Sequence, residues 1–112
     1  MAGVNKVIIM GRCGKDPELT FASSGTSIAK FSIATSEKFK DEEKTEWHNI
    51  VAFGKIAESC EKYLAKGCRA YVEGKIHTNS WEDDAGNKKY KTEVIALTVQ
   101  FIDFKKDDNP PV

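Results

Sequence analysis

The chain has 112 residues, 40% of them hydrophobic and 30% charged, and its 17 basic side chains balance 17 acidic ones. This composition is typical of one soluble globular domain; it excludes a disordered chain, and no apolar run approaches the roughly 20 residues that span a bilayer. The formal net charge of zero excludes long-range attraction of a strongly basic protein to nucleic acid, so any such binding must come from basic residues gathered locally.

The N-terminal residues 1–6 have neither a long apolar stretch nor a small-residue cleavage pattern, so the sequence predicts no signal peptide and a cytoplasmic location. The three cysteines, Cys13, Cys60 and Cys68, are odd in number and form no C-x-x-C pair. We therefore expect reduced thiols, no metal site and no cofactor.

The first two predicted strands lie on either side of a loop. Residues 4–12 are rich in β-formers and end before a Gly and an Asp-Pro pair, which predicts a strand followed by a loop. After a turn at residues 23–26, residues 27–35 alternate between apolar and polar side chains, which predicts a second strand. Residues 37–44 are charged except for Phe39, and we expect them to form a solvated loop.

The third predicted strand, residues 45–53, carries two aromatic rings on one face. Alternation places Trp47 and Phe53 on the same side as Asn49, and His48 on the opposite side with two aliphatic residues that suit a core. A rise of about 3.3 Å per residue separates the two rings by about 20 Å, too far for them to stack on each other. From this strand alone, core packing and stacking on a ligand explain the rings equally well.

Residues 55–66 change to helical periodicity, with Ile56, Cys60 and Leu64 on one stripe, and Gly67 stands where a left-handed C-cap would fall. Residues 68–76 return to strand composition and can continue through Trp81 to a turn at residues 83–87, which predicts a hairpin. The last strand, residues 90–103, is expected to have one continuous apolar face from Ile95 onward.

The element order is three strands, one helix and two strands, which is the order of the OB-fold. This fold is a five-stranded Greek-key barrel, all-β apart from a helix between strands 3 and 4, and it binds oligonucleotides or oligosaccharides. A split α+β sandwich is the main structural alternative. We expect one domain over residues 1–104, followed by a short, polar and mobile tail at residues 105–112.

Four aromatic side chains lie outside the expected core. Trp47 and Phe53 are on the third strand, Phe39 precedes it, and Trp81 stands among polar neighbours near the end of the hairpin. Exposed rings beside a strand of nucleic acid act as sequence-tolerant platforms, each contributing about 1–3 kcal/mol per stacked base. The placement of these rings favours base stacking over core packing.

The same residues resemble a known family, the bacterial and phage single-stranded DNA-binding proteins, from Gly3 to about Asp103. The segments that carry the resemblance are residues 3–8, 15–18, 34–37, 45–48, 53–58, 63–67, 72–74 and 90–94. The resemblance implies an OB-fold that assembles as a homotetramer and binds single-stranded DNA without sequence preference during replication, recombination and repair. It also implies a location with the nucleoid, or in the host cytoplasm for a phage protein.

The resemblance assigns roles to individual residues. Trp47, Phe53 and Trp81 match the base-stacking aromatics of the family, and Phe39 stands where the family commonly has tryptophan. The family lysines that meet phosphate are matched at Lys6, Lys55 and Lys66, and His48 matches a position at the subunit interface.

Departures from the family pattern are equally specific. The chain has Asn79-Ser80 before the hairpin tryptophan, where the family is often basic, and Asn49 in place of a common arginine. Arg12 and Lys38 are candidates to replace part of this charge. Because each phosphate contact contributes about 0.7 to the salt slope for single strands, we expect weaker and less salt-sensitive binding than in a family member with the full basic set.

The C-terminus departs as well. The family's long linker is absent, and residues 107–112 end in valine instead of proline and phenylalanine. Replication and repair proteins are the partners that a family tip recruits, and the altered tip argues against that recruitment here.

The sequence leaves three alternative functions. An accessory, primosome-type OB-fold protein would bind single strands weakly, act mainly through protein contacts and tolerate loss of its tryptophans. An oligosaccharide-binding OB-fold would stack sugars on the same rings, but lysines beside the rings disfavour it. An enzyme is the weakest alternative, because His48 and His77 lie on different elements and no nucleophile elbow, phosphate loop or metal cluster is present.

Overall fold

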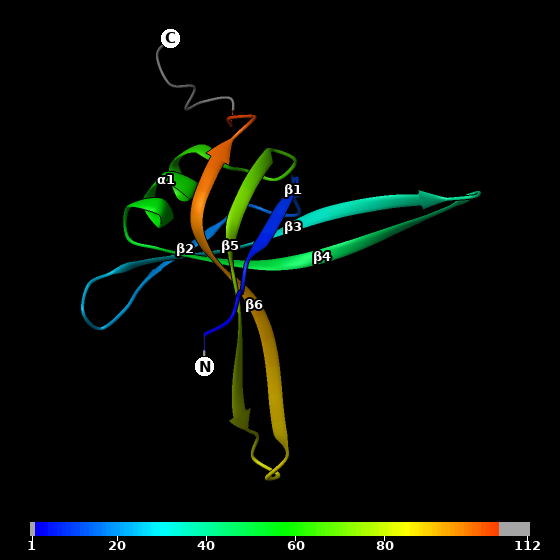
Figure 1. The fold of residues 1–112 in the computed structure, drawn as a ribbon. Helices are drawn as coiled ribbons and strands as arrows, with labels where there is room; N and C mark the ends of the chain where they lie inside the picture. The colour runs from blue at the N-terminus through cyan, green and yellow to red at the C-terminus, as the bar shows by residue number, and fades with distance from the viewer. Residues whose placement is uncertain (1, 106–112) are drawn as a thin grey trace.

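A computed structural model describes residues 2–105 of the chain (Figure 1). Most of the predicted tail, residues 106–112, lies outside the described residues, as does Met1. The elements in chain order are β1 (Val7–Cys13), β2 (Glu18–Phe21), β3 (Ser27–Phe39), β4 (Glu42–Phe53), α1 (Lys55–Tyr63), β5 (Arg69–Glu82) and β6 (Lys88–Phe101).

Five of the strands close into a barrel. The hydrogen-bonded order is β1-β5-β6-β4-β3, and β1 returns to β3 through the pairs Arg12↔Ala34 and Cys13↔Ile33. All of these pairings are antiparallel except that of β4 with β6, which is parallel. Short β2 only extends the sheet beside β3. The predicted OB-fold is confirmed, with α1 between the third and fourth barrel strands.

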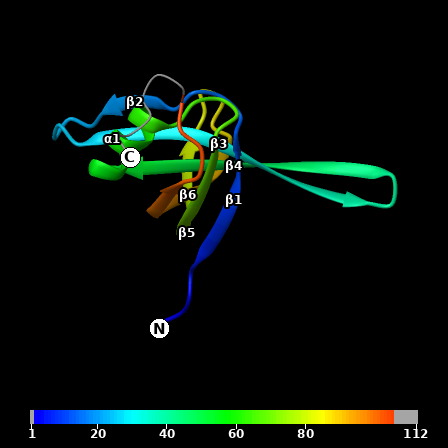
Figure 2. The same ribbon diagram turned by 90° about the horizontal axis from the view of Figure 1, so that it is seen from above.

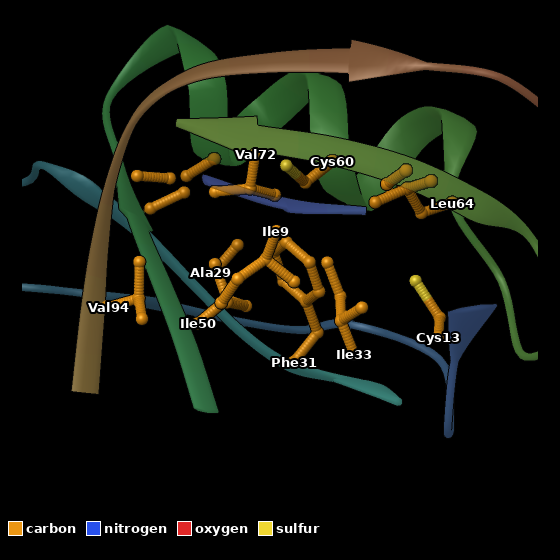
Figure 3. Close-up of a cluster of buried hydrophobic side chains, with 14 of the residues drawn as sticks. Ile9, Cys13, Ala29, Phe31, Ile33, Ile50, Cys60, Leu64, Val72 and Val94 are labelled. Atoms are coloured by element: carbon orange, nitrogen blue, oxygen red, sulfur yellow. The ribbon is translucent and has the colours of Figure 1, made fainter. Parts of the chain in front are cut away.

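The core fills the barrel and the space beneath α1 (Figure 3). Alternation along β3 turns Ala29, Phe31 and Ile33 inward, and the helix contributes Ala57 and Cys60. Two cysteine thiols are strongly perturbed by burial, which raises the pKa of Cys13 to about 11 and that of Cys60 to about 12. All three cysteines are free and buried, and because thiols that stay protonated at neutral pH are poor nucleophiles, Cys13 and Cys60 are expected to be unreactive.

The helix is shorter than the sequence predicts. It ends at Tyr63, and Leu64 has extended backbone angles (φ −98°, ψ 146°) with its side chain in the core. Gly67 has φ 90° as expected for a left-handed residue, but it lies in the turn before β5, where its N–H donates to the carbonyl of Cys13 (2.8 Å). The prediction of Gly67 as the C-cap is wrong, because tertiary contact with β1 fixes its conformation.

The charged segment predicted as a loop at residues 37–44 is instead the end of a two-stranded arm. β3 runs to Phe39 and β4 starts at Glu42, with Lys40 at φ 58° in the connection. Lys38 faces Glu43 across this arm, and opposite charges on facing strands stabilise pairing. The loop prediction is wrong because charged residues also form strands when opposite charges face each other, as Lys38 and Glu43 do. Figure 2 shows this arm projecting away from the barrel.

A β-bulge changes the inward face of β6. Glu73 pairs with Thr98 and Gly74 with Ala96, so Leu97 is the extra residue and is 61% exposed. Before the bulge Val94 and Ala96 face the core, and beyond it Val99 and Phe101 pack against the core. The predicted continuous apolar face from Ile95 is therefore wrong, because the bulge shifts the alternation by one residue. A side chain at Gly74 would collide with the carbonyl oxygen of Ile95, so the close strand approach here requires glycine.

Candidate functional site

The outward face of β4 carries the two rings that the sequence singles out. Trp47 is 57% exposed and Phe53 is 43% exposed, whereas Ile50 and Ala52 on the opposite face are buried. The predicted core face and outer face of this strand are thus observed, except that Val51 on the outer face is also buried. The two rings are free to contact a ligand.

Two adjoining hollows connect the rings into one groove. The first, about 310 Å³, lies at Trp47 and Asn49, and the second, about 440 Å³, lies at Phe53. Both are bordered by Lys30 and Glu93. We use "the groove" for these two hollows together; its side chains come from β3, β4, β5 and β6, with Lys15 and Glu18 at the Trp47 end.

The groove gathers four lysines that the sequence analysis did not select. These are Lys15, Lys30, Lys75 and Lys91. Lys30 is opposite Val51 in the β3/β4 register, and Lys91 is opposite Asn79 in the β5/β6 register. Alternation alone predicts that Lys30 faces away from Phe31, but the pairing of β4 with β6 that gathers these lysines is not encoded by any local pattern.

The Trp47 ring rests against the backbone of the first loop. A Cβ atom built at Gly14 would collide with Cζ3 of the ring, and the Gly14 N–H donates to the carbonyl of Ser32 at 3.1 Å. The absence of a side chain at Gly14 therefore lets the indole lie close to the loop. This contact fixes the position of one stacking surface.

A buried carboxylate lies at the junction of the two hollows. Glu93 is 6% exposed, and its Oε1 accepts a hydrogen bond from Asn79 Nδ2 at 2.7 Å. Lys91 Nζ is 3.8 Å from Oε2. The other end of the Asn79 amide, Oδ1, lies 2.9 Å from His77 Nε2. The junction of the two hollows therefore holds the negative charge of Glu93, hydrogen-bonded to Asn79, with lysine side chains nearby.

The third predicted platform, Trp81, lies on the β5/β6 arm. It is 49% exposed and opposite Lys89. Alternation along β5 places Trp81 on the same face as His77 and Asn79. Trp81 is therefore on the same face of β5 as two residues, His77 and Asn79, that line the second hollow.

Phe39 lies apart from this surface. It is exposed near the end of the β3/β4 arm, where Lys40 Nζ is 5.5 Å from the ring centroid. Alternation along β3 assigns Phe39 to the face that continues from Ile33, opposite to the face that carries Trp47. Phe39 is therefore not on the face that carries Trp47, and its contact with DNA stays a prediction.

The basic residues selected from the sequence do not line the groove. Lys55 lies at the start of α1 beside Phe101, and Lys6 lies beside Glu73 before β1. The Lys66 backbone N–H donates to Asp16 Oδ1 at 2.9 Å. Arg12 Nη1 donates to the carbonyl of Gly67 at 2.9 Å. These four residues surround the barrel at other positions.

His48, selected as an interface residue, lies half-buried on the barrel side of β4. Its Nε2 is 2.8 Å from Thr35 Oγ1 on the paired strand. The ring thus has a hydrogen-bond partner within the chain, and it points away from the face that carries Trp47 and Phe53.

The C-terminal end of β6 is held by an ion pair. Arg69 donates to the Asp103 carboxylate through Nε at 2.9 Å, Nη2 at 3.1 Å and the backbone N–H at 3.0 Å. These hydrogen bonds lower the pKa of Asp103 to about 2. Beyond it, Phe104 packs edge-on against Tyr63 at 5.6 Å between ring centroids. The end of the barrel is therefore tied to α1.

Among residues 2–105, no cluster of three or more His, Cys, Asp or Glu side chains is placed to hold a metal ion. The helix that the structure describes is neither long enough nor apolar enough to cross a membrane.

Residues 4–102, which include every strand and the helix, match the model of the single-strand binding protein family. Single-stranded DNA-binding protein 1 of Chlorobaculum tepidum is 47% identical over 109 residues, covering 92% of this chain and 67% of the relative. The solved structure of a Plasmodium falciparum SSB in complex with ssDNA superposes with a TM-score of 0.84 at 35% identity, covering 92% of this chain and 98% of the other.

Proposed function

Because the chain belongs to the single-strand binding protein family, we propose that it binds single-stranded DNA without sequence preference and protects it during replication, recombination and repair. The observation that carries the proposal is the groove, with exposed Trp47 and Phe53 at its two ends and four lysines around it. Rings of this kind accept any base, since every base has a flat face to stack. The activity requires binding alone and no catalytic group.

The charges of the groove suggest how the strand lies in it. Glu93, where the two hollows meet, repels phosphate, whereas Lys30 beside the same junction and Lys15 and Lys75 in the separate hollows attract it. We infer that bases lie over the groove and stack on Trp47 and Phe53, while the sugar-phosphate chain follows the lysines. Trp81 then extends the stacking surface along the β5/β6 arm.

Binding can be measured by the fluorescence anisotropy of a labelled oligo(dT), which does not depend on the protein's own two tryptophans. The double variant Trp47→Ala, Trp81→Ala is expected to lose about 2–6 kcal/mol of binding free energy, since each stacked base contributes about 1–3 kcal/mol. Phe21→Ala is the matched control, because Phe21 is an exposed aromatic that borders neither hollow. Unchanged affinity in the double variant would favour the accessory, primosome-type alternative.

We also propose that the chain assembles as a homotetramer. Ile8 and Met10 are more than half exposed on the outer face of β1, and exposed Leu97 lines a hollow with Glu73, the β5 residue that pairs with Ile8. Within the described structure β1 pairs with β3 only at Arg12 and Cys13, so one edge of residues 7–11 is unpaired. An open edge and an apolar face are two surfaces on which copies of the chain can pair. We place half-buried His48 at the boundary between subunits.

Light scattering coupled to size-exclusion chromatography tests the assembly. The wild-type protein is expected to elute with the mass of four chains, and Ile8→Lys is expected to elute with a lower mass because a charge cannot be buried on an apolar interface. Lys40→Ala, at the end of the β3/β4 arm, is the control. A wild-type mass of one chain would contradict the proposal.

The proposed domain covers residues 1–104. Lys105, the first residue of the expected tail, is still hydrogen-bonded to α1, its backbone N–H to the carbonyl of Tyr63 at 2.9 Å and its Nζ to the carbonyl of Glu61 at 3.1 Å, so contact with the helix extends one residue beyond this boundary. Recruitment of replication or repair proteins by residues 106–112 is a separate hypothesis on residues outside the described structure.

A further inference from the structure

His77 occupies the second hollow of the groove. It lies beside Phe53, Lys30 and Lys75, on the β5 strand that leads to Trp81. In the sequence, His77 only argues against an enzyme, because it lies on a different element from His48. In the structure it is instead an exposed, cation-forming side chain on the surface that carries the stacking rings.

The hydrogen bonds of Asn79 determine which ring nitrogen of His77 carries a proton. An ionised carboxylate only accepts hydrogen bonds, so the Asn79 amide must present its NH₂ group to Glu93 (2.7 Å) and its oxygen to His77 (2.9 Å). His77 Nε2 is therefore a donor. Nδ1 can gain a second proton without breaking this bond, so the neutral and charged forms of the ring share one orientation.

The charged groups around His77 have opposite effects on protonation of its ring. Glu93 is directly opposite His77 in the β5/β6 register and favours the imidazolium, and Lys91 lies diagonally across. Lys75 on the same strand and Lys30 on β3 disfavour it, while β4 contributes only Val51 and Phe53 to this hollow. A DNA phosphate that follows Lys75 along the side of this hollow adds a negative charge beside the ring and favours the protonated form.

We propose that His77 contacts a phosphate of the bound strand as an imidazolium, so that affinity for single-stranded DNA increases as the pH falls. The inference rests on the proposed function and adds to it a binding residue and a dependence on protons. The two residues before Trp81 are Asn79 and Ser80, neither of which can carry a charge. Among the residues of β5 on the same face as Trp81, His77 is the titratable one nearest in sequence, whereas Lys89 lies opposite the ring on β6. Imidazole side chains in general change charge between about pH 5 and 8, so this is the range in which the affinity is expected to change.

The test compares wild type, His77→Gln and His77→Arg by anisotropy of labelled oligo(dT) at pH 5.8 and 7.8 and constant ionic strength. Thymine and phosphodiesters do not titrate in this range. Wild type is expected to bind roughly fivefold more tightly at the lower pH, as for one partly exposed ion pair. The Gln variant is expected to be weak and the Arg variant tight at both pH values. The other histidine, His48, and the N-terminal amine are present in all three proteins, so their contributions cancel.

A salt titration gives a second readout. One additional phosphate contact increases the magnitude of the salt slope by about 0.7 for single strands, so the wild-type slope is expected to be steeper at pH 5.8 than at 7.8, with no change in either variant. The same pH dependence in wild type and His77→Gln would overturn this inference alone. Absence of oligo(dT) binding at both pH values would overturn the proposed function and this inference with it.

Discussion

Gly14 determines where the Trp47 ring can lie, because a Cβ atom at this position would meet the indole directly. The obstructing atom is at the outer end of a side chain, so Gly14→Ala is expected to move the ring and leave the fold intact. We expect a loss of about 1 kcal/mol or more in oligo(dT) binding, part of the value of one stacked base. Anisotropy measures the loss, and unchanged unfolding by urea confirms that the barrel remains stable.

Gly3→Ala provides the matched control for this substitution, since nothing lies within 4 Å of the added atom at Gly3. Equal affinity in the two alanine variants would show that the position of Trp47 is not set by Gly14.

Asp103 makes stability depend on pH in a predictable direction. Its pKa in the folded protein is about 2, below the ordinary value of 3.8, because Arg69 donates hydrogen bonds to it. The carboxylate therefore stabilises the fold above about pH 4, and this contribution is lost as the pH falls toward 2. Asp103→Asn is expected to be less stable than wild type at pH 7 and equally stable near pH 2, as measured by urea unfolding.

Asp84→Asn is the control for Asp103, because Asp84 is exposed in the β5/β6 turn. A stability difference between Asp103→Asn and wild type that stays constant from pH 7 to pH 2 would contradict the assigned role of the ionised carboxylate.

At the scale of elements, the β3/β4 arm determines what Phe39 can contribute. The ring lies on the opposite side of the arm from Trp47. At the end of the arm, Lys38 and Lys40 are outnumbered by Asp41, Glu42 and Glu43, so this segment offers phosphate no net attraction. Phe39→Ala is therefore expected to cost less than about 0.5 kcal/mol in binding a short oligo(dT), whereas Trp47→Ala is expected to cost about 1–3 kcal/mol. Equal losses in anisotropy titrations would show that the arm folds onto the bound strand.

Features set by one strand can be predicted from the sequence, whereas features set by contacts between strands cannot. The orientation of Trp47 and Phe53 is predictable because alternation is a local property of one strand. The face of β6 is not, because the bulge at Leu97 arises where Gly74 brings two strands unusually close. The arm at residues 37–44 was predicted as a loop because its cross-strand charge pairs become visible only once the register is known.

The groove illustrates the same limit. Its rings were predictable from the sequence, but its four lysines are gathered by contacts between β3, β4, β5 and β6 that are distant along the chain. Lys6, Lys55 and Lys66 were selected by resemblance to the family, and their contact with DNA stays a prediction.

At the scale of the whole molecule, these outer lysines predict a dependence on strand length. Lys55 and Lys66 lie outside the groove, so a strand must leave the groove to reach them. The double variant Lys55→Ala, Lys66→Ala is expected to bind an oligo(dT) of about eight nucleotides normally. With a strand several times longer, its salt slope should fall by about 1.4, the value of two phosphate contacts.

Lys30→Ala is the comparison for this length dependence, because Lys30 borders both hollows. It is expected to weaken binding to short and long strands alike. If the outer double variant also weakened the short strand, the strand path would have to include α1 from its first nucleotides.

The pairing that closes the barrel has a consequence for synthesis of the protein. β1 is made first, yet its partner along residues 7–12 is β5, where Arg12 pairs with Arg69. At about 5–20 residues per second a ribosome needs roughly 3–12 s to supply that partner. During this interval the β3/β4 arm can already pair locally, while Ile8 and Met10 have no folded strand beside them. The nascent chain is therefore most exposed to aggregation or to a chaperone at its N-terminal strand until β5 emerges.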